Sequence, residues 1–273
     1  ANKGFLTPAT EFDTEFSGKK YFFDKGIYEK RVYDSKGVAH PEVEIQFGPN
    51  IKDWPAMKEL SDDLLVKVVS EIHDPVTTTD ELIPSGETSS FRSNPLGLAE
   101  FTLSRRDPSY VGKAKAVRDL TDDVKAEVEN VAKAFDAKYA DMAGRVSKAG
   151  LGSTIFAVKP GDGSAREQAA SCQKVLGGWA NIANEYATKR YRSNLINWGM
   201  LPFIYKDGDK NLPFANDDYV FVPNVKKMIT DKLSTTKAYA IKKDGTITEF
   251  ELTMGDLTDD ERKIILAGCL INY

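Results

Sequence analysis

The sequence predicts an α/β fold, and two observations from the second half of the chain support this class. Short runs of apolar and β-branched residues, typical of buried strands, alternate with segments of helical periodicity. Clusters of glycine, proline, asparagine and aspartate separate the two kinds of segment. Because such alternation usually places parallel strands side by side with helices between them, we expect at least one partly parallel sheet.

Length and composition fit a globular protein with a connecting segment at its start. The 273 residues are enough for one large or two small domains, and 41% of them are hydrophobic and 29% charged. Residues 1–50 are rich in aromatic residues and turns, so we interpret them as an extended linker. The compact domain is expected to span residues 51–273.

The first half of this domain is expected to hold a strand, a long loop and two helices. The apolar run 64–72 is typical of a buried strand, and the polar run 73–94 after it is long enough to suggest a functional loop. A helix is expected to begin after Pro95. Apolar residues spaced by three and four predict a long amphipathic helix with Thr121 as its N-cap and Gly150 as its stop.

The second half holds the alternating elements. Strands are expected at 153–160, 179–186, 201–205 and 217–223, and a hairpin at 238–252 with its turn at Asp244–Gly245. Helices are expected from about Arg166, at 187–198 and at 224–233. The last helix opens with Thr258 and Glu261, which have the spacing of a capping box.

Charge and hydropathy argue against two kinds of partner. The formal net charge is −4 and the pI about 5.5, whereas binding of nucleic acid normally requires a basic face. No apolar run approaches the roughly 20 residues of a membrane span, and the first residues lack the apolar core of a signal peptide. We therefore expect a cytoplasmic protein with no nucleic-acid and no membrane partner.

Cysteine and histidine are too scarce for a metal site built by this chain alone. Zinc and iron–sulfur sites need three or four sulfur or nitrogen ligands at close spacing. The chain has two residues of each type, Cys172, Cys269, His40 and His73, and none is in a CxxC arrangement. We expect no metal or cofactor bound by this chain and interpret each cysteine as an unpaired packing residue.

The stretch GDGSAREQAA, residues 161–170, is the strongest candidate for a binding site. Glycines let a backbone approach a ligand, and the first turn of a helix offers unpaired N–H groups and partial positive charge. Arg166 adds a guanidinium suited to a carboxylate or a phosphate. The stretch matches neither a P-loop nor a G-x-S-x-G elbow. It therefore indicates an anion site, with a simple tight turn as the alternative.

Ser164 is a candidate base within this stretch. A serine hydroxyl is a weak base at neutral pH, but its alkoxide would be stabilised by a helix N-terminus and by an adjacent arginine. We expect that Ser164, with Arg166 beside it, removes a proton from carbon in a substrate that bears a carboxylate.

Several separated motifs resemble the C-terminal swivelling domain of the aconitase and isopropylmalate dehydratase family. Residues 161–203 are similar to the family's G-S-x-R-E-x-A-A loop, its later L-G-G and its N-L-x-x-x-G-x-L-P segment. The loop TTTDELIPSGETSSFR resembles the family's T-T-D-x-I-x-x-x-G loop, and Asp80 and Arg92 keep its spacing. The ending LAGCLINY is similar to the family's terminal helix. The resemblance spans about residues 48–273.

The resemblance implies a fold, a reaction and a set of site residues. The fold would be a three-layer β/β/α swivelling domain, and the reaction a dehydration and rehydration of a hydroxy tricarboxylic acid of the citrate and isocitrate type, as in aconitate hydratase, a hydro-lyase. Ser164 would be the base, Arg166 would stabilise its charge and bind substrate, Arg92 would clamp a substrate carboxylate, and Asp80 would belong to the same catalytic site.

Two departures from the family pattern bear on the substrate. Ala165 stands where aconitases usually have a second serine that holds a substrate carboxylate, and Glu81 stands where a histidine is usual. The identity of the substrate is therefore open. Arg92 favours a tricarboxylate over an isopropylmalate-like molecule, because a buried guanidinium without a carboxylate would be costly.

The family's reaction also implies a cofactor and a partner. It needs a [4Fe–4S] cluster held by three cysteines, which this chain cannot supply. We expect the cluster on a preceding region of the same polypeptide, or otherwise on a separate large subunit, and the chain alone to be inactive. The first choice rests on the initial Ala1 and on the linker character of residues 1–50. The alternative function is a non-catalytic anion-binding or regulatory module of the same fold.

Overall fold

The structure, a computed structural model, describes residues 4, 6, 22–29, 37–208 and 211–273. Contacts divide the chain into two units, Ala1–Gln46 and Phe47–Tyr273. The described part of the first unit contains helix α1 (Gly26–Glu29), beside which Phe23 stacks on Tyr28 with 5.4 Å between ring centroids. The linker role of residues 1–50 stays a prediction.

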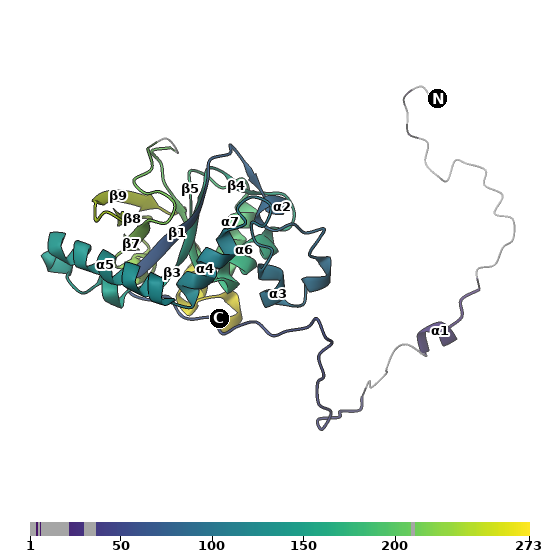
Figure 1. The fold of residues 1–273 in the computed structure, drawn as a ribbon. Coiled ribbons are helices and arrows are strands. Elements are labelled where there is room, and N and C mark those ends of the chain that lie inside the picture. Colours follow the sequence, from purple (N-terminus) through teal and green to yellow (C-terminus); the bar gives the residue numbers. More distant parts are fainter. Residues whose placement is uncertain (1–3, 5, 7–21, 30–36, 209–210) are drawn as a thin grey trace. The chain divides into compact units, whose positions relative to one another are not determined.

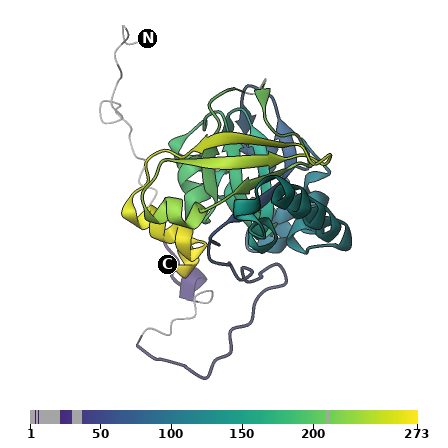
Figure 2. The same cartoon turned by 90° about the vertical axis from the view of Figure 1, so that its left-hand side faces the viewer.

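Seven strands of the second unit form one closed sheet (Figures 1 and 2). Around the sheet they are β1 (Leu64–Ile72), β3 (Gly150–Ala157), β5 (Gly178–Ala183), β6 (Leu201–Ile204), β9 (Ile247–Thr253), β8 (Thr235–Ile241) and β7 (Tyr219–Val222). Neighbours from β1 to β6 are parallel, and β7, β8 and β9 are antiparallel. The α/β class and its partly parallel sheet are confirmed.

The closure of the sheet differs from the three-layer arrangement that the resemblance implied. β1 pairs with β7 in antiparallel fashion, and β6 meets β9 at a single pair, Ile204 and Thr253. The parallel and antiparallel strands are thus joined at both edges. Strand pairing describes one barrel-like sheet rather than two separate sheet layers.

Helices cover the parallel half of this sheet on one side. Helix α4 (Tyr110–Arg118) packs on β1 and β3, and α6 (Arg166–Val175) contacts both α3 (Pro95–Ala99) and α7 (Lys189–Asn197). Their buried faces share one core, which includes Val69, Ile155, Tyr110, Ala169 and Leu195. A second core fills the interior between the sheet and helices α8 (Val225–Thr230) and α9 (Asp259–Ala267).

The long amphipathic helix begins at its predicted N-cap, Thr121, but ends earlier than expected. Helix α5 spans Asp122–Lys138, and Tyr139 leaves the helical conformation with φ −125° and ψ 70°. The chain continues in short 3-10 helices at Ala140–Met142 and Val146–Lys148. Because 3-10 turns have three residues each, the apolar spacing persists beyond α5 and feeds the same core. The predicted stop at Gly150 was wrong, since Gly150 begins β3.

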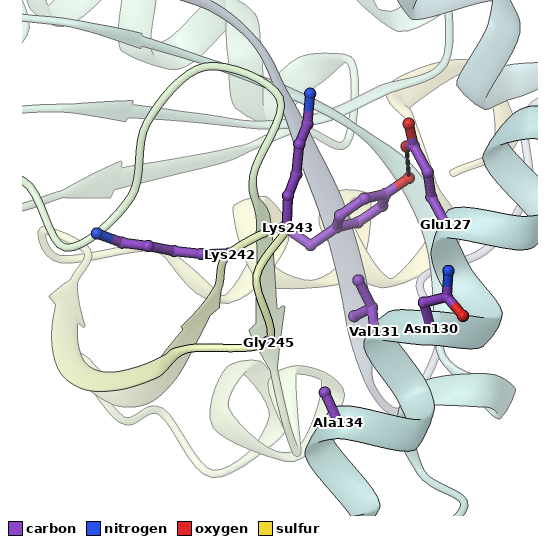
Figure 3. Close-up of a pocket in the computed structure, with 8 residues that line it drawn as sticks. Glu127, Asn130, Val131, Ala134, Lys242, Lys243 and Gly245 are labelled. Atoms are coloured by element: carbon purple, nitrogen blue, oxygen red, sulfur yellow. Dashed lines mark hydrogen bonds between the residues drawn. The ribbon is translucent and has the colours of Figure 1, made fainter.

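Strand β1 is buried along almost its whole length, as expected for a strand covered on both faces. Its one charged buried side chain, Lys67, forms an ion pair with Glu127 of α5. Glu127 also accepts a hydrogen bond from the hydroxyl of Tyr219 at 2.8 Å. Figure 3 labels Glu127 and marks this hydrogen bond with a dashed line. The hydrogen-bonded ion pair lowers the pKa of Glu127 against the opposing effect of burial.

The remaining predictions from the sequence concern caps, cysteines and membrane spans. Thr258 and Glu261 form the predicted capping box of α9. Cys172 and Cys269 are buried and unpaired, as expected. Among the described residues no helix combines the length and the apolar character that a membrane crossing would require. Two further 3-10 helices are present, at Ser89–Phe91 and Leu270–Asn272.

Candidate active site

The two loops singled out in the sequence leave the same edge of the sheet. β1 and β3 are parallel neighbours, so their carboxyl ends lie together. Each strand is followed by a short second strand, β2 (Thr77–Thr78) and β4 (Pro160–Asp162), and these two pair in parallel. The pairing places the segment that carries Asp80 beside the segment that carries Ser164.

The first loop opens with a capped helical turn. Helix α2 (Thr79–Leu82) has Thr78 as its N-cap, and the side chains of Thr78 and Glu81 form a capping box. The amide of Thr78 donates to Glu81 Oε2 at 2.7 Å, and the amide of Glu81 donates to Thr78 Oγ1 at 3.2 Å. Glu81, which stands where the family usually has histidine, therefore has a structural role in this chain.

Asp80 is held by an arginine that sequence reasoning missed. Arg105 donates to Asp80 Oδ2 at 2.8 Å and to Glu87 Oε1 at 2.7 Å, so it bridges the start and the middle of the loop. The amide of Ser85 donates to the other oxygen of Asp80 at 3.2 Å. These two carboxylates raise the pKa of Arg105, chiefly through the hydrogen bond with Glu87. In the sequence, the only signal for Arg105 is that it is next to a second arginine, Arg106.

The second loop needs glycine at two positions, because neighbouring side chains leave no space for a Cβ atom there. Gly161 has φ +98° and Gly163 has φ +130°, values that side-chain-bearing residues rarely adopt. A Cβ atom at Gly161 would lie 2.3 Å from the ring of Tyr191, and one at Gly163 would lie 2.2 Å from Thr79 Oγ1. The glycines thus allow the loop to approach α7 and α2 closely.

A hydrogen-bonded platform lies beneath Gly161. Thr188 Oγ1 donates to the carbonyl oxygen of Gly161 at 3.2 Å and accepts from the amide of Tyr191 at 3.1 Å. The buried hydroxyl of Tyr191 accepts from Gln173 Nε2 at 2.9 Å and from Asn181 Nδ2 at 2.8 Å. Burial raises the pKa of Tyr191, so the phenol stays neutral. The platform anchors the loop to α6, α7 and β5.

The start of α6 carries the predicted anion-binding groups. Ala165 is its N-cap residue and no side chain caps it, so the first-turn N–H groups have no side-chain acceptor. Ser164 is exposed just before this turn, and Arg166 is half-buried. The Nε atom of Arg166 is buried and has no hydrogen-bond partner within the described part of the chain. This end of α6 therefore offers donors for an anion.

Arg92 differs from the expectation. It follows the 3-10 helix at Ser89–Phe91 and is exposed, so the argument that its burial would require a carboxylate was wrong. Over the described residues no hydrogen bond or ion pair joins Arg92 to Asp80, Ser164 or Arg166. Its neighbour Phe91 and the N-cap residue Ala165 do pack against the same core.

Metal ligands are absent from the part of the chain that the structure covers. Over residues 37–208 and 211–273, and the few described before them, no three side chains of histidine, cysteine, aspartate or glutamate are grouped to hold a metal ion. The two buried cysteines are on α6 and after α9. A cluster that needs three cysteines does not fit these residues.

Comparison with known proteins identifies the central part of the chain. Residues 111–208 match the family model of the aconitase C-terminal domain. This part of the chain is similar to the aconitase C-terminal domain. The resemblance expected from the motifs is thereby confirmed for residues 111–208, which include Ser164 and Arg166. Asp80 and Arg92 precede the part that matches the aconitase C-terminal domain.

Other comparisons are reported beside this match. Among solved structures, 3-isopropylmalate dehydratase from Methanocaldococcus jannaschii is similar to this chain, with 22% sequence identity and a TM-score of 0.45. The similarity covers 77% of this chain and 92% of that chain. A comparison with curated proteins finds no match.

Proposed function

We propose that this chain provides the base and the carboxylate-binding groups of an aconitase-like hydro-lyase. Its substrate would be a hydroxy tricarboxylic acid of the citrate and isocitrate type. The observation that carries the proposal is the uncapped start of α6. There the hydroxyl of Ser164, the first-turn N–H groups and the unpartnered Nε of Arg166 belong to consecutive residues.

Two arginines are available to bind substrate carboxylates. Neither Arg92 nor Arg166 takes part in an ion pair among the described residues, and Arg166 adjoins the positive end of α6. Four other arginines are already paired with carboxylates: Arg105, Arg106, Arg118 and Arg145. Arg190, Arg192 and Arg262 also form no ion pair among the described residues, so the choice of Arg92 and Arg166 rests on the family resemblance. A substrate with more than one carboxylate could use both groups.

Ser164 would act on the carbon next to a bound carboxylate. Its alkoxide, stabilised by the helix N-terminus and by Arg166, takes the proton from that carbon. The electron pair of the broken C–H bond forms the double bond as hydroxide leaves the neighbouring carbon. The proton then resides on Ser164 Oγ, where it exchanges with solvent when the site opens, and the proton on this oxygen is the one delivered to carbon in the reverse hydration. Asp80 would act as a positioning residue, because Arg105 and Ser85 already occupy its carboxylate.

Departure of hydroxide needs a Lewis acid, and the described residues do not fit a cluster site. We therefore place the [4Fe–4S] cluster outside them, on a preceding region of the same polypeptide or on a large subunit. The exposure of Ser164 and Arg92 supports this arrangement, since a second protein surface is needed to exclude water from them. The domain would close over substrate as a swivelling unit, and cytoplasmic location remains part of the proposal.

The test is Ser164→Ala in the cluster-containing enzyme, isolated from its native cells through a tag on this chain. We expect kcat to fall roughly 10²- to 10⁴-fold with KM nearly unchanged, because the base acts mainly in the transition state. Ser147→Ala, at another exposed serine, is the matched control and should leave kcat unchanged.

A near-normal kcat for Ser164→Ala would refute the role of this serine. Calorimetry with citrate and with nucleotides then addresses the alternative function. Nucleotide binding that depends on Arg166, without any response to hydroxy acids, would indicate a non-catalytic anion-binding module.

A further inference from the structure

Lys174, near the end of α6, is a buried ammonium group that the hydro-lyase proposal does not use. The residue is 6% exposed, and no atom of the described chain forms a hydrogen bond with its Nζ. The Nζ atom lies 3.7 Å from the centroid of the Trp179 ring, which therefore covers one side of it. A cation–π contact offsets part of the cost of burial but supplies no hydrogen-bond acceptor.

Lys174 lines a cavity of about 140 Å³. The cavity lies among the segment 55–58, the end of α4 and the turn at Gly177–Gly178. One water molecule needs a cavity of only about 10–15 Å³, so this cavity has room for a small molecule with several acceptor oxygens. Lys174 therefore borders a space that a small anion can enter, and a turn of its side chain would bring the now enclosed Nζ to that space.

The charged residues that line the cavity are all cationic. They are Lys58, Arg118 and Lys174, and no aspartate or glutamate lines it. The guanidinium of Arg118 is held in place by Asp119, with Nε to Oδ1 at 2.7 Å and Nη2 to Oδ2 at 2.9 Å. Its Nη1 faces the carbonyl oxygen of Val175 at 3.4 Å. Arg118 is thus held at the edge of the cavity, with its charge paired to Asp119.

Burial lowers the pKa of Lys174 to about 7, and the nearby Cys269 acts in the opposite direction. The amine is then close to half-protonated at neutral pH. An anion beside it would favour the ammonium form and raise its pKa. Conversely, the anion would bind more tightly at pH 6 than at pH 8.5, because the ammonium form prevails below the pKa.

We propose that this cavity is a binding site for a small oxyanion, a phosphate or a short carboxylate, with Lys174 as its buried donor. Trp179 covers one side of the ammonium, so we expect the side chain of Lys174 to turn its Nζ toward an anion in the cavity. Lys58 adds positive charge from the segment before β1, and Arg118, paired with Asp119, borders the cavity from α4. The site is separate from the Ser164 loop, and the inference does not depend on the hydro-lyase proposal.

Titration calorimetry of the full chain with inorganic phosphate and with acetate, at constant ionic strength and pH 6, tests this inference. We expect Lys174→Met to weaken binding at least tenfold. Lys133→Met, at an exposed lysine of α5, is the matched control and should bind as the wild type does. Arg166→Gln removes a charge from the Ser164 loop and should retain this site. If only phosphate or only acetate binds, the result shows which class of oxyanion, phosphate or carboxylate, the site accepts.

A second measurement on the wild-type chain guards against misfolding of the variant. The ¹³Cε resonances of labelled lysines report amine protonation, and the apparent pKa of Lys174 should rise when the anion is added. Equal binding by the wild type and Lys174→Met, or loss of all binding in Arg166→Gln, would overturn the proposal. An unchanged titration of Lys174 at saturating phosphate and acetate would overturn it as well.

Discussion

Gly161 shows at the residue scale how one position fixes the conformation of the proposed catalytic loop. Its φ is +98°, and an added Cβ would lie 2.3 Å from the ring of Tyr191. We expect Gly161→Ala to lower the free energy of unfolding by roughly 2–4 kcal/mol, from backbone strain and overpacking together.

Gly144→Ala is the matched control for this prediction. Gly144 also has a positive φ, +76°, but a Cβ atom added there would meet no atom within 4 Å beyond its chain neighbours. Gly144→Ala should lower the free energy of unfolding by only about 1 kcal/mol, because backbone strain is its only cost. Urea unfolding of both variants measures the difference, and equal costs would show that Tyr191 does not press on the loop.

The sequence predicted those site residues whose environment is formed by their neighbours in the chain, but not those whose environment is formed by distant segments. Ser164 and Arg166 are adjacent to a helix start that is visible in the sequence, and the structure places them there. The exposure of Arg92 depends on how the turn at Ser89–Phe91 packs, which no local pattern reveals. The Asp80–Arg105 ion pair joins the loop to a residue beyond α3, so it too required the folded chain.

At the scale of elements, the N-cap of α7 is also the anchor of the loop. Thr188 caps α7 and donates to the carbonyl oxygen of Gly161. Thr188→Ala should cost about 1 kcal/mol of stability for the cap and also release the loop. Hydrogen exchange at the amides of residues 161–165 should therefore become faster.

Thr258→Ala provides the comparison, because Thr258 caps α9 in the same way without contact to the loop. It should cost about as much stability and leave exchange at residues 161–165 unchanged. Unchanged loop exchange in Thr188→Ala would contradict the anchoring role of α7.

Elements with several turns or a long apolar run were predictable, whereas short ones were not. The strand at 64–72 was predicted with its observed bounds, and α6 begins at Arg166 as expected. β2 and β4 escaped prediction because two or three residues show no periodicity. The capping box at Thr78 and Glu81 has a visible sequence signature, but the segment 73–94 was interpreted as a loop throughout.

At the scale of the whole molecule, the parallel pairing of β1 with β3 and of β2 with β4 brings the two loops together. The alternation of strands and helices predicted the parallel half of the sheet. The β1–β7 pairing joins residues far apart in the chain, and no local pattern specifies such a partner. Asp80 and Ser164 are also far apart in the chain, so the proximity of the segments that carry them is a property of the fold rather than of either motif.

The central claim is that Ser164, at the uncapped start of α6, removes a proton from carbon. Its most direct test is the incorporation of solvent deuterium into the substrate by the cluster-containing enzyme in D₂O. With the wild type, deuterium should appear on the carbon next to a carboxylate as citrate and isocitrate interconvert. Ser164→Ala should lose this exchange to the same extent as turnover. Exchange at the wild-type rate in Ser164→Ala would show that another group is the base and would contradict the account.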